Sequence, residues 1–171
     1  AYGMSPYGLS KELKISVREA ETFIRRYFQR YPKIKEYIDK TIKFAQENGY
    51  VKTLSGRKRY VPEIFSKNKS IKELGYRIAV NTPIQGSAAD LIKAAMVVLY
   101  KKFKKLGLKT SILLQVHDEL ILEVPENEVE IIKEIVPEIM ENPFTYLGLN
   151  YSLKVPLKVN ITFGKNWAEC K

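Results

Sequence analysis

The stretch "LLQVHDELIL", residues 113–122, interrupts an apolar run with one imidazole and two carboxylates. His117, the single histidine of the chain, opens this polar interruption, and a second apolar run follows it at once. The spacing predicts two antiparallel strands, over residues 110–116 and 120–124, joined by a tight turn. The three polar residues therefore belong at or near the tip of a hairpin.

The carboxylates of this turn, Asp118 and Glu119, have two interpretations. Between apolar strands an ionised carboxylate is partly desolvated, and a cation has to compensate that cost. Carboxylate oxygens suit Mg²⁺, and two such ions about 4 Å apart can clamp the attacking and leaving oxygens of a phosphoryl transfer. The alternative is an ordinary solvated turn, which the tripeptide alone favours because Asp and Glu are common turn residues. A two-metal site also needs a further carboxylate, and no second one stands in a comparable strand.

Length and composition indicate a folded chain without a membrane span. Its 171 residues allow one domain or two small ones, and 45% of them are hydrophobic. No apolar run approaches the ~18–20 residues that cross a bilayer. The first residues lack the pattern of a secretion signal, and the one cysteine, Cys170, has no partner within the chain. These features predict a cytoplasmic protein without disulfides.

The net charge of +10 is unevenly distributed along the chain. Residues 1–110 hold 24 lysines and arginines against 9 acidic residues, whereas residues 111–171 hold 5 against 10. A basic part beside an acidic part suggests that the first contacts a polyanion. A soluble, lysine-rich surface explains the charge equally well.

Helices dominate the first half of the predicted element order. A capping box at Ser16–Glu19 predicts a helix that ends before Pro32, and Pro32 opens a second helix that ends at Gly49. Residues 50–62 then predict a basic hairpin around Ser55-Gly56.

The second half adds helices and the sheet. A capping box at Ser70–Glu73 predicts a helix that Pro83 breaks or kinks, and helical spacing resumes to Leu106. After the carboxylate hairpin, a helix follows Pro125, and a last strand lies within residues 152–163. The predicted class is α+β, with helices first and then a small antiparallel sheet.

Four segments resemble, in the same order, the family A DNA polymerases of the bacterial DNA polymerase I type. They are "YGMSPYGLSKEL" (2–13), "GYVKTLSGRKRYVP" (49–62), "RIAVNTPIQGSAADLIKAAM" (77–96) and "LLQVHDELILEVP" (113–125), the last resembling the third polymerase motif. The ending "VPLKVNITFGKNW" is similar to the family's C-terminal strand. The resemblance therefore covers nearly all of the chain.

The resemblance implies roles for the residues of the carboxylate turn. Asp118 corresponds to the family's second catalytic aspartate, a ligand of the two catalytic Mg²⁺ ions, with Glu119 in a supporting role. His117 and Gln115 correspond to residues that touch the primer terminus and the minor groove near it.

The resemblance also implies DNA contacts elsewhere. Arg77, Asn81 and Gln85 correspond to residues that line the minor groove and the template side of the active site. Tyr2 corresponds to the tyrosine that stacks at the templating position. Arg57, Lys58 and Arg59 correspond to a loop that binds backbone phosphates. Minor-groove acceptors occur in every base pair, so such donors can test pairing without reading sequence. Without the resemblance, Asn81 would be interpreted as a helix cap, Gln85 as a turn residue, Tyr2 as an ordinary aromatic and the loop as a solvated tip.

Two parts of the family pattern do not occur in this sequence. They are the strand motif D-Y-S-x-x-E, which carries the first catalytic aspartate, and the helix that holds the incoming triphosphate. The resemblance therefore implies a C-terminal piece, with a fingers remnant over residues 1–75 and a palm portion with a small antiparallel sheet over residues 76–171. Such a piece would extend a primer on primer–template DNA, from deoxynucleoside triphosphates, only with a complementary N-terminal polymerase chain.

Two rival functions stay open at this point. One is a non-catalytic, basic module that binds duplex DNA through the loop at residues 57–59. The other is a metal-dependent nuclease that uses Asp118 and Glu119.

Overall fold

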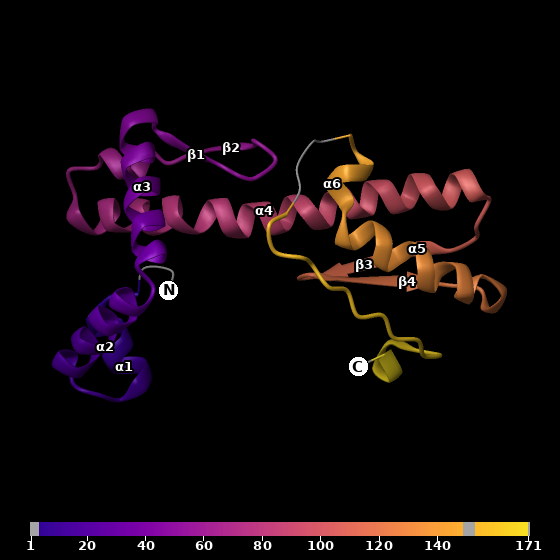
Figure 1. Ribbon diagram of the computed structural model, residues 1–171, viewed down its shortest axis with the longest axis horizontal. Helices are drawn as coiled ribbons and strands as arrows, with labels where there is room; N and C mark the ends of the chain where they lie inside the picture. The colour runs from indigo at the N-terminus through magenta and orange to yellow at the C-terminus, as the bar shows by residue number, and fades with distance from the viewer. Residues whose placement is uncertain (1–3, 149–152, 171) are drawn as a thin grey trace. The chain divides into compact units, whose positions relative to one another are not determined.

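The chain separates into two compact units, residues 1–87 and 88–171. The computed structural model describes residues 4–148 and 153–170, and Figure 1 follows the chain through its elements. The expected boundary between residues 75 and 76 lies before this division, inside one long helix. Among the described residues, no helix combines the length and the apolar character that a membrane span requires.

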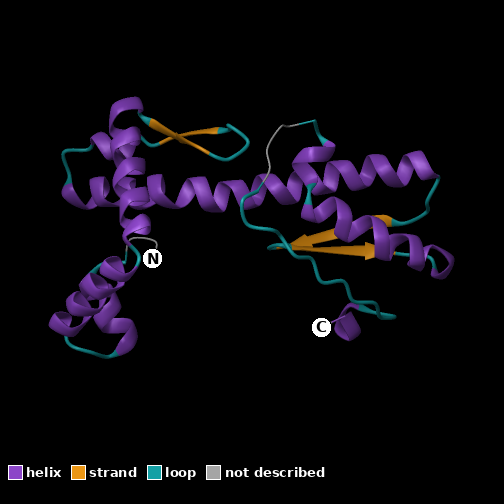
Figure 2. Cartoon of the chain, in the orientation of Figure 1, coloured by secondary structure: helices purple, strands orange, loops and turns teal. Residues whose placement is uncertain are grey.

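The first unit consists of helices and one small hairpin (Figure 2). Its elements are α1 (Pro6–Leu13), α2 (Val17–Arg30), α3 (Pro32–Asn48), β1 (Tyr50–Lys52), β2 (Lys58–Tyr60), the 3-10 helix η1 (Pro62–Phe65) and the first part of α4 (Lys69–Leu106). The predicted capping box of α2 is confirmed: Ser16 Oγ accepts the N–H of Glu19 at 3.2 Å, and Glu19 Oε2 accepts the N–H of Ser16 at 2.9 Å. Gly49 ends α3 in the left-handed region, with φ 75°, as predicted.

The core of the first unit joins α3, the hairpin and α4. Its buried residues are Ala45, Val51, Val61, Ile64 and Ala79. The Tyr37 hydroxyl of α3 donates to the Val80 carbonyl of α4 at 3.1 Å. These contacts hold the β1–β2 hairpin against α4, which matters for the basic loop.

The prediction was a break or a kink at Pro83, and the break is wrong, because helix α4 runs through this residue. Proline removes one helical hydrogen bond and costs about 3 kcal/mol in a helix interior. The bond that Pro83 cannot donate would go to the Ala79 carbonyl. Thr82 Oγ1 and Ser87 Oγ donate to other carbonyls of the same turns, those of Ile78, at 2.7 Å, and Pro83.

The start of α4 also differs from the prediction. Asn68 Oδ1 accepts the N–H of Ser70 at 2.9 Å, so Asn68 caps the helix. The helix begins at Lys69 and no capping box forms at Ser70. Asn68 stands two residues earlier and, as a preferred N-cap residue, satisfies the first N–H groups of the helix.

The second unit packs a small sheet and two helices on the rest of α4 (Figures 1 and 2). Its further elements are β3 (Ser111–Val116), β4 (Glu119–Glu123), η2 (Glu126–Glu128), α5 (Val129–Glu141), α6 (Pro143–Tyr146) and η3 (Trp167–Cys170). Helices α4 and α5 supply its buried core: Val98, Leu99, Phe103, Ile132, Ile135, Val136 and Ile139. Ile112, Leu120 and Leu122 of the sheet pack against this core.

A buried carboxylate fixes the entrance to β3. Glu128 is 7% exposed and accepts hydrogen bonds from the N–H groups of Lys109 and Thr110, at 2.8 and 2.9 Å, and from the Thr110 hydroxyl at 2.6 Å. The Thr110 hydroxyl and the Lys109 N–H lower the pKa of Glu128 below its usual value, because they stabilise the ionised carboxylate. Glu128 thereby ties η2 to the turn between α4 and β3.

The strand predicted within residues 152–163 is not formed over residues 153–163, so that prediction is wrong. The alternation itself is present, because Leu157, Val159 and Ile161 are half-buried between exposed neighbours. Ile161 packs against the core of the second unit. Alternation decides which side chains are buried, whereas a strand also needs a neighbouring backbone to pair with. With two antiparallel hairpins and mostly helical elements, the predicted α+β class is confirmed.

Candidate functional site

The basic hairpin of the first unit displays cations and aromatic rings together. Strands β1 and β2 pair antiparallel, with Lys52 opposite Lys58 and Tyr50 opposite Tyr60. The Lys58 ammonium lies 4.6 Å from the centre of the Tyr50 ring, and that of Lys52 lies 5.7 Å from it. Tyr60 is 70% exposed. This hairpin face therefore offers positive charge and an aromatic surface to an anionic ligand.

The turn of this hairpin is held together by Thr53. The N–H of Thr53 donates to the Arg57 carbonyl at 3.0 Å, and its carbonyl accepts the N–H of Gly56 at 3.0 Å. Its side-chain oxygen accepts the Arg57 N–H at 3.2 Å and bonds Ser55 Oγ at 3.0 Å. Gly56 has φ 86°, which a side chain would strain. The predicted turn at Ser55-Gly56 is thus confirmed.

The same turn docks on α4. The Leu54 N–H donates to Ser87 Oγ at 2.8 Å, and Arg57 Nη2 donates to the Gly86 carbonyl at 3.2 Å. Gly86 permits this approach, because a Cβ there would stand 2.8 Å from the Thr53 methyl carbon. A glycine inside a helical pattern was the one sequence signal that could have indicated this contact.

The docking divides the three predicted phosphate-binding residues into two kinds. The Arg57 guanidinium is engaged with the protein through Gly86. Lys58 and Arg59 are exposed on β2. All three residues are exposed, and Arg57 additionally holds the turn to α4 through the Gly86 carbonyl.

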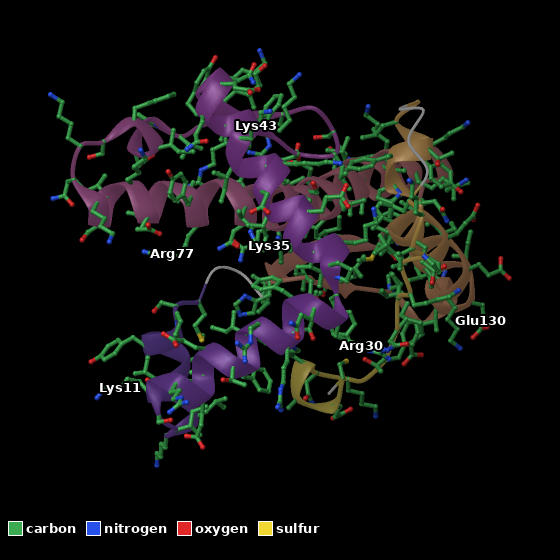
Figure 3. The ribbon with its side chains drawn as sticks, turned by 60° about the vertical axis from the view of Figure 1, so that its left-hand side comes forward. Lys11, Arg30, Lys35, Lys43, Arg77 and Glu130 are labelled. Atoms are coloured by element: carbon green, nitrogen blue, oxygen red, sulfur yellow. The ribbon has the colours of Figure 1, made fainter. Side chains whose placement is uncertain are left out.

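The residues expected at the minor groove lie along α4. Arg77, Asn81 and Gln85 are four residues apart within one continuous helix, so they lie on adjacent turns of one face. Arg77 is exposed and projects from the helix (Figure 3), and Gln85 is also exposed. Because all three are interior to α4, the alternative interpretations of Asn81 as a helix cap and Gln85 as a turn residue are wrong.

Asn81 carries an unsatisfied acceptor. Its side chain is half-buried, and its Oδ1 is buried without a hydrogen-bond partner among the described residues. A buried acceptor without a donor costs about 1–3 kcal/mol. An external donor that reached Asn81 would recover this free energy. The remaining residue of the DNA-contact prediction, Tyr2, lies outside the described residues.

The carboxylate turn of the second unit is tighter than predicted. Val116 pairs with Glu119, so the turn itself consists of His117 and Asp118. His117 has φ 54°, a conformation that few residues other than glycine adopt. The Gln115 amide donates to the His117 carbonyl at 3.1 Å, across the same turn. Strain of about 1–3 kcal/mol at such a residue is frequent at functional sites.

The tip is more exposed than its apolar flanks suggested. His117, Asp118 and Glu119 are all exposed, so the expected partial desolvation of the carboxylates is wrong. The strands bury one face only: Leu113 is 54% exposed and Leu114 is 50% exposed. The pairing shifts between Ile112 and Leu114, and such a bulge changes which side chains face the core.

The described residues offer carboxylates to a cation without completing a site. Asp118 and Glu119 form no ion pair with a described lysine or arginine. Exposed carboxylates of this kind fit Mg²⁺, which keeps several waters and takes one or two protein carboxylates. Within residues 4–148 and 153–170, no group of three potential ligands gathers that could hold a metal ion.

Comparison with known proteins gives consistent matches over the whole chain. A family model described as DNA polymerase family A matches residues 1–169. DNA polymerase I of Caldicellulosiruptor bescii is 52% identical over 170 residues, which are 99% of this chain and 19% of that protein. The thermostable DNA polymerase I of Thermus filiformis is 49% identical, with the same two coverages.

A solved structure has the same fold. The POL domain of Pol1 from M. smegmatis, in complex with DNA primer-template and dNTP, superposes with a TM-score of 0.91 at 43% identity. The match covers 99% of this chain and 29% of that one. The chain spans about a fifth of the length of the curated relatives it matches. Neither the duplex-binding module nor the nuclease is favoured by these matches.

Proposed function

The chain belongs to DNA polymerase family A, and we propose from this premise that it supplies one metal-binding carboxylate and the minor-groove contacts of a DNA-directed DNA polymerase. The reaction is addition of deoxynucleotides to a primer 3′ end. The observation that carries the proposal is the two-residue turn of the β3–β4 hairpin, which presents Asp118 to solvent beside the strained His117.

Asp118 is the proposed ligand of Mg²⁺, and Glu119 supports it. Both carboxylates are exposed at the end of a hydrogen-bonded hairpin, which limits their movement. Asp118 would hold Mg²⁺ at this place, and the bound metal would supply electrostatic stabilisation to a phosphoryl transfer. The described residues do not complete a metal site, and in this proposal the remaining carboxylate comes from a part of the polymerase outside residues 1–171.

His117 and Gln115 position the primer terminus in this proposal. The Gln115 amide holds the His117 carbonyl, so the imidazole leaves the turn in a fixed direction. Both side chains are exposed on the hairpin that carries Asp118. A primer end that they bind lies near the carboxylate that its chemistry needs.

The first unit binds the primer–template duplex. Arg77 and Gln85 donate to minor-groove acceptors, which every base pair presents, and Asn81 offers its buried acceptor to an external donor. Lys58 and Arg59 bind backbone phosphates without regard to sequence. Tyr2 stacks at the templating position.

The assignment of residues 1–75 to the fingers and 76–171 to the palm belongs to the same proposal. The solved relative binds primer-template DNA and dNTP, and we propose the same partners for the polymerase that contains this chain. We place the activity in the cytoplasm, because a chain with one cysteine and no internal disulfide suits a reducing compartment.

The decisive experiment measures single-turnover nucleotide addition by the chain assembled with a polypeptide that carries the D-Y-S-x-x-E strand. Asp118→Asn keeps the shape of the side chain and removes its charge. Loss of one electrostatic group in an active site costs a factor of about 10²–10³ in rate, and a direct metal ligand costs at least that. Duplex affinity stays the same, because the phosphate contacts lie on other residues.

The matched control is Glu123→Gln, at the other end of β4, which removes one exposed carboxylate from the same strand and leaves the rate unchanged. If Asp118→Asn keeps more than about a tenth of the rate, Asp118 is not a catalytic metal ligand. The chain without the complementary polypeptide is expected to show no extension. Steady extension by the purified chain alone would contradict the need for a second source of carboxylate.

A further inference from the structure

The last turns of α4 carry a cluster of cations that the proposed polymerase site does not use. We name Tyr100, Lys101, Lys104 and Lys105 the lysine patch. Tyr100 is 61% exposed, and all three lysines are exposed. The residues lie at i, i+1, i+4 and i+5, so they cover one side of the helix over two turns. The core side of the same turns is formed by Leu99 and Phe103.

The patch lysines differ from the ion-paired lysines of α3. In α3, Lys33 and Lys40 both contact Glu36, at 2.7 and 2.6 Å, and Lys35 contacts Asp39. No lysine of the patch forms an ion pair with a described residue.

The sequence explains the difference in pairing. No aspartate or glutamate occurs between Asp90 and Asp118, a stretch that contains the whole patch. The repulsion between neighbouring ammonium groups is therefore not offset by acidic residues of their own segment. A bound polyanion would remove it.

The helix dipole accounts for part of this cluster only. Cations stabilise the C-terminus of a helix, but the effect falls off within the last turn. Lys104 and Lys105 lie in that turn, whereas Lys101 precedes it. The exposed ring of Tyr100 is uncharged and gains nothing from the dipole.

The exposed ring of Tyr100 favours single-stranded nucleic acid over an acidic peptide as the ligand. The Lys104 ammonium lies 5.7 Å from the centre of the Tyr100 ring, so charge and ring act on one place. Successive positions 101 and 105 are separated by about 6 Å along the helix axis. A phosphate chain can bridge ammonium groups at such a spacing, while an unpaired base stacks on the ring. An acidic peptide would use the charge but has no base to stack.

We propose that the lysine patch is a docking surface for single-stranded nucleic acid, with Lys101, Lys104 and Lys105 on phosphates and Tyr100 under a base. This surface lies within the second unit and is additional to the duplex contacts of the first. It engages the strand without sequence preference, since every base has a stacking face.

The test compares two charge-matched variants of the full chain, after thermal unfolding has shown that both are folded. The patch variant is Lys101→Gln/Lys104→Gln/Lys105→Gln, and the control is Lys33→Gln/Lys35→Gln/Lys40→Gln. The probe is a fluorescent 12-nucleotide oligo-dT, titrated at several salt concentrations. The slope of log affinity against log salt is expected to fall by about 2 in the patch variant, at about 0.7 for each lost phosphate contact, and to change little in the control.

Tyr100→Ala separates stacking from charge. It should weaken oligo-dT binding at least about fivefold and leave binding of an abasic 12-mer unchanged. Acetylation of the lysines, followed by mass spectrometry, should show Lys101, Lys104 and Lys105 protected by the oligonucleotide while Lys33 is not.

Three results would overturn the proposal. The first is an unchanged salt slope in the patch variant. The second is equal loss of oligo-dT and abasic binding in Tyr100→Ala. The third is stronger competition by polyglutamate than by oligo-dT, which would assign the patch to an acidic protein. The proposed polymerase function is tested separately, since Lys58→Gln/Arg59→Gln should weaken duplex binding whatever the patch does.

Discussion

Alanine at position 86 should push the basic hairpin away from α4. Its Cβ would stand 2.8 Å from Thr53 Cγ2 and 3.4 Å from Arg57 Nη2. Carbon atoms in contact are about 3.5–4.0 Å apart, so the turn has to retreat by about 1 Å. Thr53 is 5% exposed, and its hydroxyl is bonded to Ser55 and Arg57, so the methyl cannot rotate away without breaking those bonds.

The expected cost of Gly86→Ala follows from three opposing contributions. Overpacking of a buried contact costs about 1–3 kcal/mol. Loss of the hydrogen bond from Arg57 to the Gly86 carbonyl costs about 1 kcal/mol. Alanine in place of glycine returns about 1 kcal/mol of helix propensity. The net loss of stability in the first unit is therefore about 2 kcal/mol.

A second substitution tests the mechanism. Thr53→Ser deletes the obstructing methyl and keeps the hydroxyl, and alone it costs about 1 kcal/mol. In the double variant the clash is gone, the hydrogen bond from Arg57 is restored and the helix propensity remains, so it should be about 3 kcal/mol more stable than the two single effects predict.

Hydrogen exchange measured by mass spectrometry over residues 50–61 reports this local stability, with urea unfolding of the whole chain as a second readout. The single variant should exchange faster in these peptides, and the double variant should return close to wild type. Strictly additive effects would refute the assigned contact between Gly86 and Thr53.

Two further predictions concern the second unit. The pKa of Glu128 is lowered chiefly by the Thr110 hydroxyl, so its contribution to stability is present above the usual glutamate pKa of 4.5 and is lost as pH falls below it. Glu128→Gln should destabilise the unit at pH 7, and the free energy of unfolding, measured with urea at several pH values, should then fall less steeply below pH 4.5. An unchanged decrease with falling pH would contradict the role of Glu128. At position 117, with φ 54°, His117→Val should destabilise the β3–β4 hairpin by more than about 1 kcal/mol, because β-branched residues do not tolerate that region. His117→Asn is the control and should leave the stability nearly unchanged. Thermal unfolding of both His117 variants measures this difference.

Local patterns predicted most of the elements. The capping box at Ser16, the left-handed glycine at position 49 and the turn at Ser55-Gly56 are each decided by atoms within a few residues. The same holds for the hairpin around His117 and Asp118, whose apolar runs and short spacing leave little choice of turn. The polymerase motifs were likewise recognisable, because their residues are contiguous.

The sequence failed where a neighbour outside the segment decides the outcome. Proline at position 83 predicts a break, but α4 is continuous there, and Ala79 of the preceding turn is buried in the core of the first unit. The alternation over residues 153–163 reads as a strand, yet strand formation depends on a pairing backbone. The apolar flanks predict that the hairpin carboxylates are desolvated, but Asp118 and Glu119 are exposed. A shift in strand pairing accompanies the exposure of Leu113 and Leu114 in β3.

The sequence by itself therefore determined the class, the order of elements, the hairpin that carries Asp118 and the resemblance to family A polymerases. Tertiary structure alone decided that Arg57 reaches the Gly86 carbonyl, and that Asn81 lies within a helix with a buried acceptor. The physical reason is the separation along the chain between the atoms that interact. Caps, turns and apolar periodicity depend on atoms a few residues apart, whereas burial and hydrogen-bond partners depend on segments that only the folded chain brings together.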